Sequence, residues 1–137
     1  MKIVREYLEF EKMDFERGKE PYSELGVGKK QAIEQWLRSM YIEEYRINSD
    51  LSIDILKDVN LVDLDLKELP SYIKFRKIYG GFYAGGNDWE SLNGFPDEVE
   101  GDLQLRSPAY PKGYLNSKIF NEDEIRKLIK VYGKIYH

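Results

Sequence analysis

The stretch "NDWESLNGFPDEVEGDLQL", residues 87–105, decides the fold. Its apolar residues stand singly, at Leu92, Phe95, Val99 and Leu103, and the turn-forming pairs Asn-Gly, Pro-Asp and Gly-Asp lie between them. A helix would not tolerate so many turn-formers, and one continuous strand would not need them. The pattern therefore predicts short strands separated by tight turns.

The same spacing recurs along the chain, which indicates an internal repeat. The segment "DVNLVDLDLKELPSYIKFRKI", from Asp58, aligns with "GFYAGGNDWESLNGFPDEV", from Gly81, and then with the segment that follows. The apolar positions coincide at offsets of 23 and then 21 residues. At offset 23 the pairs are Val59 with Phe82, Leu61 with Ala84, Leu66 with Trp89 and Leu69 with Leu92; at offset 21 they are Ile78 with Val99, Gly80 with Gly101 and Phe82 with Leu103.

A period of this length is typical of leucine-rich repeats, in which one unit cannot bury its apolar face alone and neighbours stack to share a core. Two repeats and the opening strand of a third are too few to stand alone, so flanking helices are needed as caps. The predicted fold is α+β, with N-terminal helices, a short leucine-rich-repeat-like β-solenoid of two to three rungs and a C-terminal capping helix. One domain is expected over residues 1–137, divided into a helical cap (1–44), repeat strands (45–106) and a loop with the C-terminal cap (107–137).

Three segments carry helical patterns. "IVREYLEF", residues 3–10, has apolar spacing compatible with one helical face, and "KKQAIEQWLRSMYIEEY", residues 29–45, has a clear apolar stripe. The stripe consists of Ala32, Ile33, Trp36, Leu37 and Met40. "NEDEIRKLIKVYG", residues 121–133, opens with a capping-box pattern of Asn121 and Glu124. Its expected apolar face is Ile125, Leu128 and Ile129, with Gly133 at the helix C-cap.

Composition narrows the function classes. The chain has 137 residues, 42% hydrophobic and 34% charged, with a net charge of -4. An acidic chain is a poor match for nucleic acid or an anionic membrane, which favour basic surfaces. There is no cysteine, so a disulfide framework and a thiolate zinc site are excluded. The charged N-terminal sequence and the lack of a long apolar run predict a cytoplasmic protein without a membrane partner.

The segment "GGFYAGGNDWESLNGFPDEVEGDLQL" resembles the L-T-S-L-x-G-x-P-x-x-V-x-G-D-F repeat of leucine-rich-repeat-like proteins encoded by tailed bacteriophages. "FERGKEPYSELGVGKKQAIEQWL", "KELPSYIKFRKI" and "FNEDEIRKLIKVYGKIY" are similar to the segments that flank the repeats in these proteins. The chain departs from the pattern in its few repeats, in Trp89 at a leucine position and in "RSPAYPKGYLNS" in place of a further unit. The resemblance implies a phage origin, and hence a location in the cytoplasm of an infected bacterium, more than an activity.

The motifs that suggest catalysis or metal binding have simpler explanations. "GVGKK", residues 26–30, lacks the first glycine and the final Ser or Thr of a phosphate-binding loop, so a solvated loop before a helix is expected. His137 is the single histidine and the last residue, which leaves no nitrogen or sulfur metal site and no Ser-His-Asp triad. The carboxylates in "DLDL" and "PDEVEGD" alternate with core residues and are expected on a solvated face. No cofactor is predicted.

The predicted strands also present an outward face. If Val59, Phe82 and Leu103 point inward, their successors Asn60, Tyr83 and Gln104 point outward from neighbouring strands. Asp58, Gly81 and Asp102 form a parallel outer row, and Val62, Gly85 and Arg106 form another. The predicted partner-binding residues are Asn60, Tyr83, Gln104, Asp102 and Arg106. The alternative is a face that meets only solvent or the helical cap.

These features favour a non-catalytic phage protein that binds a host macromolecule, with inhibition of a host defence or metabolic protein as one expected role. A second hypothesis is a virion or assembly component, which predicts stable self-association. A third is an enzyme or small-ligand-binding protein that uses surface carboxylates, which predicts acidic side chains converging in a pocket with raised pKa values. A host protein is the expected partner, and the sequence leaves the oligomeric state open.

Overall fold

The computed structural model describes residues 27–107 and 120–137. The chain divides into two compact units, Met1–Glu43 and Glu44–His137. The expected helix at residues 3–10 and most of the "RSPAYPKGYLNS" segment lie outside the described residues. Within the described ranges, no helix is long and apolar enough to cross a membrane.

The described part of the first unit contains helix α2, Val27–Ser39. Ile33 and Leu37 are fully buried, as expected from the stripe, whereas Trp36 and Met40 are only half-buried. The helix ends because Tyr41 adopts a left-handed conformation with φ of 61°. The backbone N–H of Tyr41 donates to the carbonyl of Arg38 and that of Ile42 donates to the carbonyl of Leu37, which is the Schellman arrangement.

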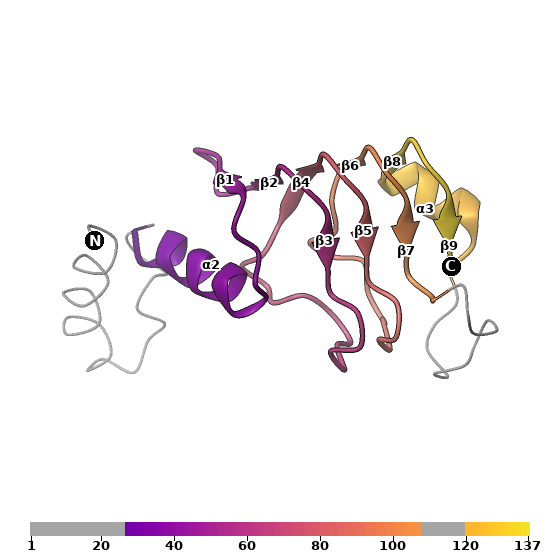
Figure 1. Cartoon of the computed structure of the whole chain (residues 1–137), viewed down its shortest axis with the longest axis horizontal. Coiled ribbons are helices and arrows are strands. Elements are labelled where there is room, and N and C mark those ends of the chain that lie inside the picture. The colour runs from indigo at the N-terminus through magenta and orange to yellow at the C-terminus, as the bar shows by residue number, and fades with distance from the viewer. Residues whose placement is uncertain (1–26, 108–119) are drawn as a thin grey trace. The chain divides into compact units, whose positions relative to one another are not determined.

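The second unit consists of two sheets and a short helix (Figure 1). The five-stranded sheet has the order β1 (Tyr45–Ile47), β2 (Ile53–Ile55), β4 (Phe75–Ile78), β6 (Glu98–Val99) and β8 (Lys130–Val131). The four-stranded sheet has the order β3 (Val59–Asn60), β5 (Phe82–Tyr83), β7 (Leu103–Gln104) and β9 (Ile135–Tyr136). Among the strand pairs of residues 44–107 and 120–137, β1–β2 is antiparallel and the others are parallel. From β2 onward the chain therefore alternates between the two sheets.

Strand register confirms the alignment made from the sequence. Val59 pairs with Phe82, and Phe82 pairs with Leu103. Ile78 pairs with Val99 in the other sheet. Both sheets contain a fourth parallel strand that the alignment did not include, because β8 and β9 follow a helix rather than a repeat unit.

The core of the second unit lies between the two sheets. Phe75 of β4 meets Phe82 of β5 edge-to-face, with ring centroids 5.4 Å apart. Phe95 stacks on Phe82 at 5.2 Å and receives the edge of Trp89 at 4.9 Å. All four rings are almost completely buried. Trp89 is thus a core residue, as its leucine position in the repeat indicated.

The predicted fold class is wrong. A leucine-rich-repeat-like β-solenoid of two to three rungs with a C-terminal capping helix is not what forms: the described residues build a mixed five-stranded sheet and a parallel four-stranded sheet. Strands of two residues are too short to show an alternating pattern, and β8, Lys130–Val131, lies outside the repeat alignment, so the sequence did not reveal the full extent of the larger sheet.

The predicted end of the C-terminal helix is also wrong. Helix α3, Glu122–Leu128, begins with the expected capping box between Asn121 and Glu124. It ends earlier than expected, because Ile129 is already extended at φ of -130° and ψ of 125°. Leu128 is consequently 64% exposed instead of packed in the core. Gly133 lies between β8 and β9 and is not the C-cap of this helix. Two further strands therefore follow the helix in the chain.

Candidate protein-binding surface

Four residues of the parallel four-stranded sheet form a row across the strands, which we call the tyrosine–amide row. It consists of Asn60, Tyr83, Gln104 and Tyr136, which are paired in register. Asn60 is exposed and the other three are half-buried. Adjacent strands lie about 4.8 Å apart, so the row extends over roughly 14 Å. Three of its members were predicted from the sequence, and the row alternates carboxamide with phenol.

The phenol ring of Tyr83 lies over the backbone of Gly81. A Cβ atom at position 81 would collide with the Tyr83 ring, so Gly81 provides the space in which the ring lies. Partial burial raises the pKa of Tyr83, and the negative charges of Asp58 and Asp102 raise it further. The hydroxyl therefore stays protonated at neutral pH and retains its hydrogen-bond donor.

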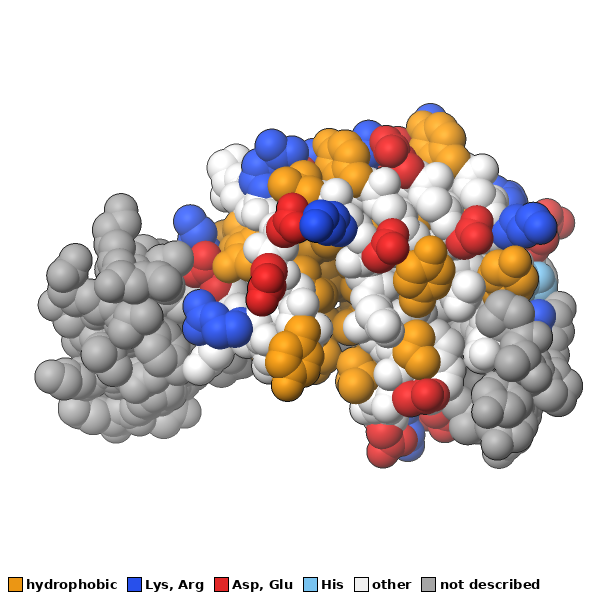
Figure 2. All heavy atoms as spheres, in the orientation of Figure 1, with side chains coloured by type: hydrophobic (Ala, Val, Ile, Leu, Met, Phe, Trp, Pro, Cys, Tyr) orange, Lys and Arg blue, Asp and Glu red, His pale blue; other side chains and the backbone are white. Residues whose placement is uncertain are grey.

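Asp58 and Asp102 flank Tyr83 and also hold the strands together. One carboxylate oxygen of Asp58 accepts from the backbone N–H of Gly81 at 2.7 Å, and one of Asp102 accepts from the backbone N–H of Lys134 at 2.8 Å. Asp102 was predicted as a partner-binding residue, and the structure gives it this second, structural contact. Figure 2 shows acidic side chains interspersed with side chains of the hydrophobic class, which includes tyrosine, over β3, β5 and β7. The surroundings of the row are thus acidic.

Arg106, the last predicted contact residue, follows β7 and does not belong to the row. Its Nε donates to the carbonyl of His137 at 3.2 Å, and one terminal nitrogen donates to the carbonyl of Ser107 at 3.4 Å. These contacts tie the end of β7 to the end of the chain. Its guanidinium is therefore engaged by backbone carbonyls in this structure.

Sequence reasoning missed Tyr136, the fourth member of the row. The offset from Gln104 to Tyr136 is 32 residues, against 21 to 23 for the other steps, because α3 and residues 108–119 intervene. The alternation in "KIYH" at residues 134–137 was the available signal. It indicated a short strand but not the register of that strand.

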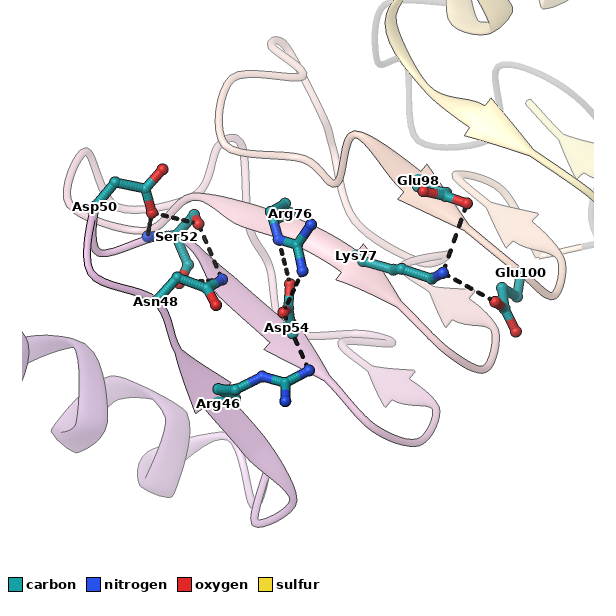
Figure 3. Close-up of polar contacts among 9 residues, drawn as sticks. All are labelled: Arg46, Asn48, Asp50, Ser52, Asp54, Arg76, Lys77, Glu98 and Glu100. Carbon is teal, nitrogen blue, oxygen red and sulfur yellow. Dashed lines mark hydrogen bonds and ion pairs between the residues drawn. The ribbon is translucent and has the colours of Figure 1, made fainter.

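The five-stranded sheet presents a second row, of alternating charge (Figure 3). Its register brings together Arg46, Asp54, Lys77, Glu98 and Lys130, from β1, β2, β4, β6 and β8. Lys77 is bracketed by Glu98 at 3.7 Å and Glu100 at 3.1 Å. Opposite charges directly across strands stabilise a sheet, and this row has nearly equal numbers of each sign.

Asp54 is the one fully buried member of that charged row, with a side-chain exposure of 0%. Arg76 donates two hydrogen bonds to its carboxylate, of 2.8 Å from Nε and 2.6 Å from a terminal nitrogen. A terminal nitrogen of Arg46 lies 3.5 Å from the same carboxylate. Burial alone would raise the pKa of Asp54. Hydrogen bonds from Arg76 and Asn48, together with the two guanidinium charges, outweigh burial and lower it. The cluster braces β1, β2 and β4 against one another.

These carboxylates do not resemble catalytic acids. The carboxyl groups with resolved shifts in the described ranges are Asp50 and Asp54, and both have lowered pKa values. Hydrogen bonds from the Ser52 side chain and backbone are the main cause at Asp50. A general acid needs a raised pKa. Within residues 27–107 and 120–137, no three His, Asp or Glu side chains gather as metal ligands would.

The comparisons with known proteins found no match: no family model, no curated protein and no solved structure matches this chain. Between the two rows, the tyrosine–amide row is the better candidate for a binding surface. The charged row already satisfies its own charges, whereas phenol and carboxamide groups can still donate and accept hydrogen bonds at a surface.

Proposed function

We propose that this chain is a protein-binding protein without catalytic chemistry of its own, and that it contacts its partner through the tyrosine–amide row. The observation that carries the proposal is the register of four parallel strands, which sets Tyr83 and Tyr136 on one face with a carboxamide beside each. Tyrosine is enriched at protein interfaces because it combines a large apolar ring with a hydrogen-bonding hydroxyl.

The backbone of the row supports binding because it is fixed before the partner arrives. Each strand is hydrogen-bonded to the next, for example from Leu61 N–H to the Tyr83 carbonyl at 2.7 Å and from Ala84 N–H to the Gln104 carbonyl at 2.7 Å. A rigid surface loses little conformational entropy on association. The acidic flanks at Asp58 and Asp102 favour a partner with basic groups facing them.

A bacterial protein is the partner that we propose. The similarity of residues 80–105 to repeats of tailed-bacteriophage proteins supports a phage origin, and a phage protein meets its partners in the bacterial cytoplasm. Inhibition of a host defence or metabolic protein is the role that this origin favours. The alternative role, a virion or assembly component, requires the chain to associate with itself.

The test is affinity capture with the tagged full-length chain from bacterial lysate, followed by mass spectrometry. The variant is the double substitution Tyr83→Ala, Tyr136→Ala. The matched control is Tyr132→Ala, because Tyr132 is an exposed tyrosine that precedes β9 and lies outside the row. A single stoichiometric protein is expected with the wild type and with the control, and its recovery is expected to fall sharply with the double variant.

Affinity measured on the purified pair gives the magnitude. Truncating a central interface tyrosine costs about 1–2 kcal/mol, so the double variant is expected to weaken binding by at least about thirtyfold. Equal binding of the wild type and the double variant would rule out the tyrosine–amide row. Recovery of the bait alone, as a discrete oligomer by light scattering, would favour the assembly role instead.

A further inference from the structure

A groove lies on the second unit between residues 90–97 and helix α3, and we call it the α3 groove. It has a volume of about 490 Å³, within the range of ligand-binding sites. Its apolar lining comes from both walls and consists of Leu92, Phe95, Pro96, Phe120, Leu128 and Ile129. No member of the tyrosine–amide row lines it.

Leu128 is the unusual residue in this lining. Helix α3 buries Ile125 fully, yet its last residue, Leu128, is 64% exposed on the groove wall. Leu92, on the opposite wall, is half-buried, while Phe95 and Ile129 form a floor that is at least 97% covered. The groove thus has an apolar floor and an apolar side chain at its rim that solvent reaches. Exposed apolar surface gathered in a concavity is typical of interaction sites.

The walls of the groove are held in place. Lys74 donates from Nζ to the carbonyl of Phe95 at 2.9 Å and to the carboxylate of Asp97 at 2.8 Å. The backbone N–H of Lys130 donates to the carbonyl of Asp97 at 2.8 Å. Gly94 adopts φ of 84°, and a Cβ there would collide with the backbone of Ile73. The groove is therefore formed by the fold itself and not by a chance side-chain arrangement.

The described residues that line the groove include more acidic than basic side chains. Its charged lining residues are Lys74, Glu90, Asp97 and Glu124. Lys74 is paired with Asp97, whereas Glu90 and Glu124 are exposed. One Glu124 oxygen accepts from the backbone N–H of Asn121 in the capping box, which leaves its negative charge without a cationic partner among the ion pairs of the described residues. Glu90 has only a distant contact, 3.9 Å, with Lys67 outside the groove. An occupant that presents cations on both sides of an apolar group would complement this lining.

We propose that the α3 groove binds a peptide segment of a partner protein in which an apolar side chain is flanked by Lys or Arg. The apolar side chain lies against Leu128 and the Phe95 floor, and the cations face Glu90 and Glu124. A peptide fits better than an enclosed small molecule, because a wall residue as exposed as Leu128 cannot surround a ligand on all sides. This proposal does not depend on the tyrosine–amide row, and either surface can be correct alone.

The experiment uses the labelled full-length chain on an array of immobilised heptapeptides with a central Leu, Ile, Phe or Met and randomised flanking residues. The groove variants are Leu128→Ser and Glu90→Lys, and both changes fall on exposed side chains, so folding is expected to survive. Leu64→Ser is the matched control, because Leu64 is also exposed and does not line the groove. Circular dichroism verifies that each variant is folded.

Binders are expected to be enriched in Lys and Arg at the flanks. Leu128→Ser is expected to weaken the best of them about tenfold through lost apolar contact. Glu90→Lys is expected to reduce the enrichment in cations, and Leu64→Ser to change nothing. The proposal is overturned if no heptapeptide binds above background, if binders carry no excess of cations, or if Leu128→Ser binds as well as the wild type. None of these outcomes bears on Tyr83 or Tyr136, so failure here is distinct from failure of the proposed function.

Discussion

Replacing Asn87 by alanine should cost the second unit much of its stability. Asn87 is only 2% exposed. Its amide nitrogen lies 2.6 Å from the carbonyl of Leu61, with the carbonyls of Ala84 and Gly85 at 3.2 Å, and its oxygen accepts from two backbone N–H groups. The two donors are the N–H groups of Leu64 and Leu66, at 2.9 and 3.0 Å. One side chain thus satisfies backbone groups at Leu61, Leu64 and Leu66, each more than 20 residues before it, as well as backbone groups close to it in the sequence.

The magnitude follows from counting these bonds. A carboxamide has two N–H groups and one oxygen, so the three nitrogen contacts amount to about two hydrogen bonds, and the oxygen adds about two more. At about 0.5–1 kcal/mol for each of these four bonds, the lower half of the usual range, the loss is about 2–4 kcal/mol, and backbone donors left without a partner would add about 1 kcal/mol. We expect Asn87→Ala to lower the free energy of unfolding by about 3–5 kcal/mol, a large share of the total for a domain.

The assay is urea unfolding followed by the fluorescence of Trp89, in a Trp36→Phe background that removes the other tryptophan signal. Trp89 is 1% exposed and donates from Nε1 to the Ala84 carbonyl at 2.7 Å, so it reports on this part of the core. Asn60→Ala is the control, because Asn60 is exposed and accepts one backbone hydrogen bond, from Val62. A cost below about 1 kcal/mol for Asn87→Ala, equal to that of the control, would refute the reasoning.

Four further outcomes are expected. The pKa of Asp54 is lowered by folding, so its carboxylate stabilises the fold above the unfolded-state pKa of about 3.9, and this contribution is lost as the pH falls through the lower folded-state value. Asp54→Asn should therefore lower the free energy of unfolding at neutral pH and flatten its fall at acid pH, as urea unfolding across that range will measure. Gly101→Ala places a Cβ 2.9–3.0 Å from the backbone of Gly80 and Gly81. It should lower the free energy of unfolding by about 1–3 kcal/mol in the same assay. Gly81→Ala meets only the movable ring of Tyr83, so it should cost less stability while shifting the Tyr83 ring resonances in NMR spectra. Asn121→Ala removes the α3 cap and should cost about 1 kcal/mol, seen as faster amide exchange in that helix.

The sequence predicted well those features that repeat or that follow from local chemistry. The offsets that align Val59, Phe82 and Leu103 match the observed strand register, because an inward apolar residue at each strand leaves a mark in the sequence at every repeat. The capping box at Asn121 was also predictable, since it depends on two residues three positions apart. Tyr83 and Gln104 followed from the same alternation.

The remainder depended on contacts that no local pattern records. "YRINSDLSIDI" reads as a single alternating strand, yet a turn at residues 48–52 divides it into antiparallel β1 and β2. Asp54 looks like any solvated carboxylate until Arg76, 22 residues later, closes over it. Leu128 fits a helical apolar face only as long as the helix continues, and it stops there. The α3 groove could not be predicted, because its walls come from segments about 30 residues apart.

The parallel register also lets the outer residues of the strands change independently of the buried residues. In β3, β5 and β7 a buried residue is followed at once by a residue of the tyrosine–amide row, for example Val59 by Asn60 and Phe82 by Tyr83. A nucleotide change that alters the outer residue leaves its buried neighbour untouched, so recognition can drift one position at a time while the core stays constant. Under the proposed function, such a surface can follow a changing partner through single substitutions that leave the buried residues unchanged.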